Sequence, residues 1–103
     1  MPYTKHVVIP AYGRIDGTAI TGSYQTVITA TNDCYSIQVF NTCDNPIILS
    51  MDGGTTEHYE LDGEGFHIDG RANDFQFGKP TIQVKHAGSA PTQGSLRITL
   101  LQI

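Results

Sequence analysis

The sequence has no tryptophan, few charged residues and little positive charge. Charged residues occupy 16% of the 103 positions, against roughly 25% in soluble proteins generally. Six lysines and arginines stand against ten aspartates and glutamates, which gives a net charge of −4. Sequence-independent binding of nucleic acid needs a basic surface, so this balance excludes nucleic acid as an expected partner.

Long apolar runs are also missing from the chain. No segment approaches the about 18–20 consecutive apolar residues that a membrane-spanning helix needs. Residues 1–6 contain no basic region that leads into a long apolar stretch. We therefore expect a soluble protein that makes no contact with a membrane and carries no classical export signal.

Cysteine is scarce, and its placement argues against a disulfide. Cys34 and Cys43 flank the β-prone segment 35–41. If this segment is extended, nine steps of about 3.3 Å place the two Cα atoms roughly 30 Å apart. A disulfide requires a separation below about 7 Å. We predict two free cysteines at the ends of a strand, which is compatible with assembly in a reducing cytoplasm.

Helical periodicity is absent, whereas alternation of apolar and polar residues recurs along most of the chain. Short β-prone segments are separated by turn residues every 8–12 positions, and the length fits one domain. The pattern predicts an all-β fold: an antiparallel β-sandwich of jelly-roll or immunoglobulin-like type, or a small barrel, with seven to eight short strands. The expected strands cover 27–30, 35–41, 46–51, 55–61, 66–68, the alternating pair Phe75 and Phe77, 81–86 and 95–103.

Two pairings of these strands are predicted from the turns. The pair Asp52-Gly53 lies between the segments 46–51 and 55–61, and this dipeptide is typical of a hairpin because glycine adopts positive φ without strain. The last segment, 95–103, is expected to pair with 81–86 across the loop 87–94.

The first 22 residues differ from the rest. Pro10, Gly13 and Gly17 divide them into pieces too short for a central strand, yet the segment is more apolar than a solvated tail. We therefore expect an extended N-terminal arm over 1–22 and a β-sandwich domain over 23–103. The arm is expected to bind its own domain or a neighbouring molecule through Tyr3, His6, Val7, Val8, Ile9 and Tyr12.

No arrangement typical of an enzyme, a metal site or a cofactor site is found in the sequence. The four histidines do not show the spacing of paired metal ligands on one element. The cluster formed by Asp62, Glu64 and Asp69 lacks the spacing of a calcium loop, and aspartate before glycine is typical of tight turns. Neither cysteine lies in a catalytic motif. We predict no catalytic residue, metal, cofactor or small-molecule substrate.

Carbohydrate binding is an alternative of another class. Small β-sandwiches often present aromatic rings to sugars, although the lack of tryptophan weakens this hypothesis. The rings available for such stacking are those of Tyr12, Tyr24, Tyr35 and Tyr59.

Two longer segments resemble short virion proteins of tailed bacteriophages. Residues 41–59 contain Asn, Asp, Pro, an apolar pair, Ser, an apolar residue, Asp-Gly-Gly-Thr-Thr and an aromatic residue in the order found in those proteins. Residues 82–99 are similar to their closing hairpin. Together the two segments cover a little over a third of the chain.

The resemblance implies a non-enzymatic capsid decoration or cement protein. Such a protein binds in many copies to the major capsid protein on the exterior of the virion, after assembly in the host cytoplasm. Neighbouring copies of the chain are further expected partners, and a trimer is expected by analogy. A head-to-tail connector, neck or small tail protein is the alternative in the same setting.

Overall fold

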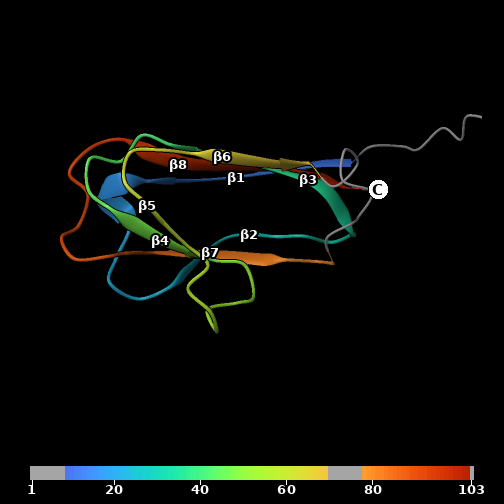
Figure 1. Cartoon of the computed structure of the whole chain (residues 1–103), viewed down its shortest axis with the longest axis horizontal. Coiled ribbons are helices and arrows are strands. Elements are labelled where there is room, and N and C mark those ends of the chain that lie inside the picture. Colours follow the sequence, from blue (N-terminus) through green and yellow to red (C-terminus); the bar gives the residue numbers. More distant parts are fainter. Residues whose placement is uncertain (1–8, 70–77, 103) are drawn as a thin grey trace, which may run out of the picture.

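The computed structural model describes residues 9–69 and 78–102, which form eight strands in two sheets (Figure 1). We call the sheet with the strand order β1-β8-β3-β6 sheet A and the sheet with the order β2-β7-β4-β5 sheet B. The strands are β1 (Ile9–Asp16), β2 (Gln25–Thr29), β3 (Cys34–Asn41), β4 (Ile47–Ser50), β5 (Tyr59–Leu61), β6 (Phe66–Asp69), β7 (Thr81–His86) and β8 (Ser95–Gln102). One turn of 3-10 helix, Gly17–Ala19, follows β1.

The strand pairing identifies the sandwich as a jelly roll. β1 pairs with β8, β2 with β7, β3 with β6 and β4 with β5, and every one of these pairs is antiparallel. The pairs are nested from the two ends of the chain toward its middle, as in a long hairpin that has been rolled up into two layers. Figure 1 shows sheet A above and β2, β4 and β7 of sheet B below. The all-β sandwich predicted from the sequence is thus confirmed.

Alternation along the strands decides which side chains enter the core. In β8, Leu96, Ile98 and Leu100 are buried, whereas Arg97 between them is exposed. Successive side chains of a strand point to opposite faces, so each sheet presents one apolar face to the other sheet. The core between the sheets contains Ile20, Ile28, Ala30, Cys34, Ile37, Val39, Cys43, Ile47, Leu49, Leu61, Ile82, Val84, Leu96, Ile98 and Leu100.

The structure describes the second half of the segment that was expected to form an arm. β1 pairs with β8 along its whole length, from Ile9 opposite Gln102 to Asp16 opposite Ser95. β1 is an edge strand of sheet A, and an edge position tolerates Pro10. A Cβ atom on Gly13 would lie 2.5 Å from the carbonyl oxygen of Val27 in β2, so glycine permits a close approach of the two strands. Residues 9–22 are therefore part of the sandwich.

The pairing of 81–86 with 95–103 predicted from the sequence is wrong. β7 lies between β2 and β4 in sheet B, whereas β8 lies between β1 and β3 in sheet A. The eight residues of the loop 87–94 carry the chain from one sheet to the other. Adjacency in the sequence favours pairing only when the connection is a tight turn, and this connection is long enough to cross the sandwich.

The hairpin predicted around Asp52-Gly53 is confirmed as a pairing of β4 with β5. Gly53 and Gly54 both have positive φ, at 76° and 95°, as the turn residues predicted. The connection is longer than a tight turn, since β5 begins only at Tyr59. The predicted segment around Phe75 and Phe77 lies outside the described residues. Within the described ranges, no helix is long and apolar enough to cross a membrane.

Candidate interaction surface

Of the six residues predicted to contact a partner, the structure describes the side chain of Tyr12. Tyr3, His6, Val7 and Val8 lie outside the described residues, and Ile9 begins β1. Tyr12 is 56% exposed. The guanidinium carbon of Arg97 lies 5.2 Å from the centre of its ring, which is within the range of a cation–π contact.

Tyr12 belongs to a larger surface on the side of sheet A that faces away from the core. We call this surface the outer face of sheet A. It consists of the side chains on β1, β8, β3 and β6 that alternate with the buried residues. Its exposed members are Pro10, Tyr12, Arg14, Asp16, Arg97, Phe40 and His67. Arginine and aromatic residues are enriched at the centres of protein–protein interfaces.

Phe40, like Arg14 and Arg97, is one of the residues of this surface that the sequence did not single out. Its side chain is 56% exposed although the ring is large and apolar. The strand pattern does contain a signal, because Phe40 shares the alternation of Gln38 and not that of the core residues Ile37 and Val39. An apolar residue on the polar side of an otherwise alternating strand marks a candidate contact with a partner.

A serine and a histidine meet on the same face. Ser36 Oγ of β3 lies 3.0 Å from His67 Nε2 of β6, while the Cα register partner of His67 is Gln38. A serine paired with a histidine is the first requirement of a nucleophile activated by a base. Ser36, however, is only 2% exposed and lies within a strand, so the hydroxyl is closed to a substrate. The pair holds β6 to β3.

The remaining histidines are distributed over separate elements. His58 Nδ1 accepts a hydrogen bond from the backbone N–H of Met51, at 3.1 Å, and thereby closes the loop between β4 and β5. His86 ends β7, beside Gly22. Among residues 9–69 and 78–102, no group of three or more His, Cys, Asp or Glu side chains could hold a metal ion.

Two exposed aspartates serve as acceptors that shape loops. Asp44 accepts hydrogen bonds from the hydroxyl and the backbone N–H of Thr92 and from the N–H of Gln93. The side-chain bond from Thr92, followed by the backbone bonds, lowers the pKa of Asp44. Asp52 is held in the same way, and the side-chain bonds from Thr56 and Ser50 are the main causes that lower its pKa. These carboxylates are used in fixing turns.

Both cysteines are free and buried. Cys34 is 0% exposed and Cys43 is 2% exposed. Burial is the main cause that raises the pKa of both thiols, and the neighbouring Asp33 and Asp44 raise them further. A thiol with a raised pKa and no access to solvent is a poor nucleophile. The prediction of free, structural cysteines is confirmed.

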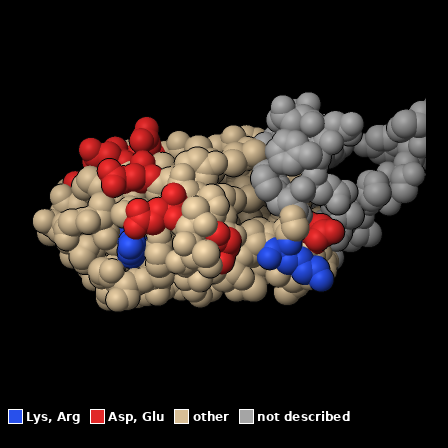
Figure 2. All heavy atoms as spheres, turned by 60° about the horizontal axis from the view of Figure 1, so that its bottom comes forward, with Lys and Arg blue, Asp and Glu red and all other residues tan. Residues whose placement is uncertain are grey.

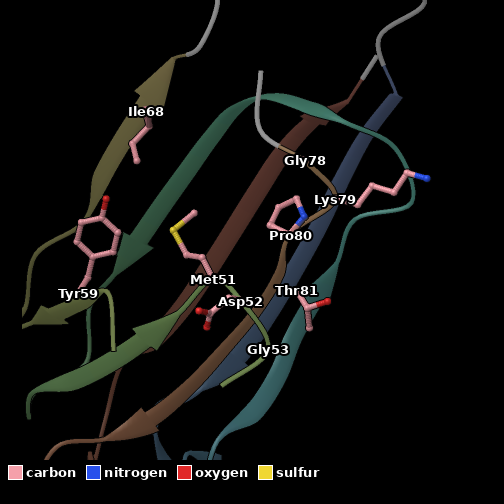
Figure 3. A pocket seen from close by; sticks show the side chains of 9 residues that line it. All are labelled: Met51, Asp52, Gly53, Tyr59, Ile68, Gly78, Lys79, Pro80 and Thr81. Atoms are coloured by element: carbon pink, nitrogen blue, oxygen red, sulfur yellow. The ribbon is translucent and has the colours of Figure 1, made fainter. Parts of the chain in front are cut away.

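A groove with a volume of about 600 Å³ lies at the edge of the sandwich, and Figure 3 shows the side chains that line it. It lies where the β4–β5 loop and β5 approach β6 and the residues that precede β7. Apolar groups from Met51, Tyr59, Ile68 and Pro80 face it, with the polar side chains of Asp52, Lys79 and Thr81 at its margin. Asp52 already accepts hydrogen bonds from Ser50, Thr55 and Thr56 of its own loop. The groove therefore offers mainly apolar contact.

The tyrosines proposed for stacking on sugars have different environments. Tyr35 is 8% exposed, and Lys85 Nζ lies 4.7 Å from the centre of the Tyr24 ring. The ring of Tyr59 packs against Phe66, with 4.4 Å between the ring centres. Tyr12 is the most exposed of the four. The structure thus does not bring the four rings together as one platform.

No protein-family model and no curated protein matches the chain. Two solved structures are similar to it. One is described by the words "Bacillus endospore appendages form a novel family of disulfide-linked pili", with a TM-score of 0.52, 14% identity, and coverage of 100% of this chain and 96% of that chain. The other is described as "Cyanophage Pam1 capsid asymmetric unit", with a TM-score of 0.49, 17% identity, and coverage of 100% and 93%. At 14% identity, the likeness to the first structure shows the β-sandwich fold alone.

Proposed function

We propose that the chain is a non-enzymatic structural protein of a phage virion, a capsid decoration or cement protein that binds the major capsid protein on the outside of the shell. The observation that carries this proposal is the nested jelly-roll pairing, an architecture that recurs in viral capsid proteins. Residues 41–59 and 82–99, which resemble phage virion proteins, lie within it, around β4 and over β7 and β8.

The burial and hydrogen bonding of the cysteine, serine and aspartate side chains support a structural role. Cys34 and Cys43 are buried, and the hydroxyl of Ser36 is closed to a substrate. Asp44 accepts hydrogen bonds from the loop that precedes β8, and Asp52 accepts them from its own loop. These cysteine, serine and aspartate side chains thus help to hold the core, the strands and the loops. A protein that works by binding needs such a rigid scaffold.

We place the contact with the shell in residues 1–8, which directly precede the edge strand β1. Tyr3, Val7 and Val8 supply apolar anchors there, and an extended segment can add to a partner through backbone hydrogen bonds and a few buried side chains. A ligand that binds only the assembled shell stabilises it by mass action. The structural role therefore needs affinity and many copies, and it needs no chemistry.

The test uses purified particles that lack this chain. Full-length protein is expected to bind them and to raise the temperature at which the shell disrupts. A variant without residues 2–8 keeps the whole of β1 and is expected to fold and to bind at least about tenfold more weakly. A second variant, with residues 2–8 in scrambled order, preserves length and charge and is expected to lose binding as well. Equal binding by all three proteins would contradict the proposed contact.

If neither the full-length protein nor the variants bind the particles, the proposed role itself is contradicted. The connector alternative differs in copy number, because a neck or tail ring holds about six or twelve copies and a shell holds hundreds. The carbohydrate alternative predicts saturable binding of the isolated protein to host polysaccharide, and it requires the open ring of Tyr12.

A further inference from the structure

The outer face of sheet A is ordered in rows that run across the strands. In one row Arg14 of β1 lies opposite Arg97 of β8, and Arg97 lies opposite Phe40 of β3. The row continues to Gly65, whose Cβ would lie 3.3 Å from the Cα of Phe40, and the exposed Glu64 precedes Gly65. From β1 toward β6, this row therefore reads positive, positive, aromatic and glycine, and the negative Glu64 precedes the glycine on the connection from β5.

The next row is polar. Tyr12 of β1 lies opposite Thr99 of β8, Thr99 lies opposite Gln38 of β3, and Gln38 lies opposite His67 of β6. Tyr12 and His67 are exposed, and the two central side chains are half-buried. Each side chain of this row is able to form hydrogen bonds.

We propose that this face is an interface between two copies of the chain, related by a two-fold axis that runs along the strands between β8 and β3. Such an axis reverses the order of the strands. β1 of one copy then lies over β6 of the second, and β8 lies over β3. The sheets of the two copies stack through their outer faces, as sheets stack in a sandwich.

The two rows are complementary to themselves under this reversal. Arg97 of one copy meets Phe40 of the second, and a guanidinium over an aromatic ring is a favourable cation–π pair. Arg14 comes to lie over Gly65 of the second copy, and the adjacent Glu64 brings a carboxylate of opposite charge next to it. Because the axis is two-fold, each of these contacts occurs twice in the dimer.

The second row gives matching polar contacts. Tyr12 of one copy meets His67 of the second, and Thr99 meets Gln38. If the second copy kept the strand order instead, β1 would lie over β1 and β8 over β8. The arginines of one copy would then face the arginines of the other. Charge complementarity thus favours a second copy in one orientation.

Two further observations agree with a second copy of the chain as the partner of this face. Arg14 already pairs with Asp16 on its own strand, at 2.8 Å, but a guanidinium has five donors and retains some for a second carboxylate. Figure 2, which brings the sheet B side of the molecule forward, shows acidic side chains mainly toward the end where β5 lies in Figure 1. On sheet A, the arginines belong to β1 and β8, whereas the turn with Asp62 and Glu64 precedes β6 at the other side of the sheet.

The size of the face fits a weak, reversible contact. Strands about 4.8 Å apart and about 3.3 Å of rise per residue give a face of roughly 450 Å² per copy, because β6 is half as long as the other three strands. Twice this area, about 900 Å², lies in the range of weak or transient interfaces. We therefore expect a dimer that dissociates on dilution.

The test measures the mass of the full-length protein by sedimentation over a range of concentrations. The expected result is an equilibrium between 11.2 kDa monomers and dimers. Arg97→Glu and Phe40→Ala are each expected to raise the dissociation constant at least about tenfold, because each change removes two contacts per dimer. Thr29→Glu, on an exposed position of β2 in the other sheet, is the control and should leave the constant unchanged.

A charge exchange tests the orientation. Arg14→Glu and Glu64→Arg are each expected to weaken the dimer, and the double variant is expected to restore it. Arg14 and Glu64 lie at opposite sides of sheet A in one copy, so rescue requires a contact between copies. The trimer expected by analogy from the resemblance would overturn the proposal. So would a monomer at about 1 mM, a dimer insensitive to Arg97 and Phe40, or the absence of rescue. The measurement uses the isolated chain and is independent of any shell.

Discussion

Arg97 of β8 lies over the ring of Tyr12 of β1, with 5.2 Å between the guanidinium carbon and the ring centre. The two residues are not register partners, since Tyr12 faces Thr99 and Arg97 faces Arg14. The contact therefore runs diagonally between neighbouring strands, as long side chains on one sheet face allow. It connects the edge strand with a central strand and makes the outer face of sheet A one continuous surface.

Acid is expected to destabilise the fold through Asp44 and Asp52. Hydrogen bonds in the folded protein lower the pKa of both carboxyls, below the about 3.9 of an unfolded chain. Their contribution is therefore fully present above that value and is lost as the pH falls through the folded pKa values. Urea unfolding should show a lower free energy of unfolding at about pH 3 than at pH 7.

Asp44→Asn separates this effect from general acid sensitivity. The variant is expected to be less stable than the wild type at pH 7 and to lose less stability on acidification. Asp62→Asn removes the same charge from another exposed loop and is the control. Equal stability of the two variants at pH 7 would show that the bonds to Thr92 and Gln93 do not support the fold.

Gly94 is expected to be irreplaceable. Its φ of 90° is unfavourable for other residues, and a Cβ atom would lie 2.1 Å from the carbonyl oxygen of Thr42. Strain of this kind costs about 1–3 kcal/mol before the backbone shift is counted, so Gly94→Ala should lower the free energy of unfolding by at least about 2 kcal/mol. Gly88→Ala, in open space, should change it by less than about 0.5 kcal/mol. Similar losses for both variants would contradict this account of the loop.

The two thiols are expected to resist modification in the folded protein. Cys34 and Cys43 are buried, and burial raises the pKa of both. A thiol reagent at about pH 8 should label neither cysteine in the native protein and both in denaturant, because the reactive thiolate needs access to solvent. Rapid labelling without denaturant, or a disulfide in non-reducing peptide mapping, would show that these side chains are not held in the core.

Gln102 is expected to anchor the loop between β2 and β3. Its Oε1 accepts hydrogen bonds from the N–H groups of Thr31 and Asn32, at 2.9 and 3.1 Å. Gln102→Leu keeps the volume but removes the acceptor, which should cost about 1–3 kcal/mol of stability. Gln93→Leu, at an exposed loop position, is the control for the change in polarity. If Gln102→Leu lowers the free energy of unfolding no more than the control does, contacts other than those of Gln102 hold this loop.

The strands could be predicted from the sequence because burial imposes alternation. Leu96, Ile98 and Leu100 alternate with polar residues in β8, and the observed strand follows that pattern. The pairing of strands could not be predicted in the same way, since β7 alternates as clearly as β8 and yet lies in the other sheet. Alternation describes one strand and its faces, whereas partner choice depends on how the long loops cross the sandwich.

The candidate surface was only partly predictable for a related reason. Tyr12 was identified from the apolar character of its segment, but Phe40 and Arg97 come together with it only when β3, β8 and β1 are neighbours. That neighbourhood follows from the jelly-roll pairing and from no local pattern. Breakers such as Pro10 likewise favoured an arm, although an edge strand accommodates them.

The number and location of copies on the particle test the proposed role most directly. Quantitative mass spectrometry of purified virions, combined with cryo-electron microscopy, gives both. The account predicts hundreds of copies on the exterior of the shell, each in contact with the major capsid protein. About six or twelve copies in a ring at the neck or tail, or the absence of the chain from the particle, would contradict it.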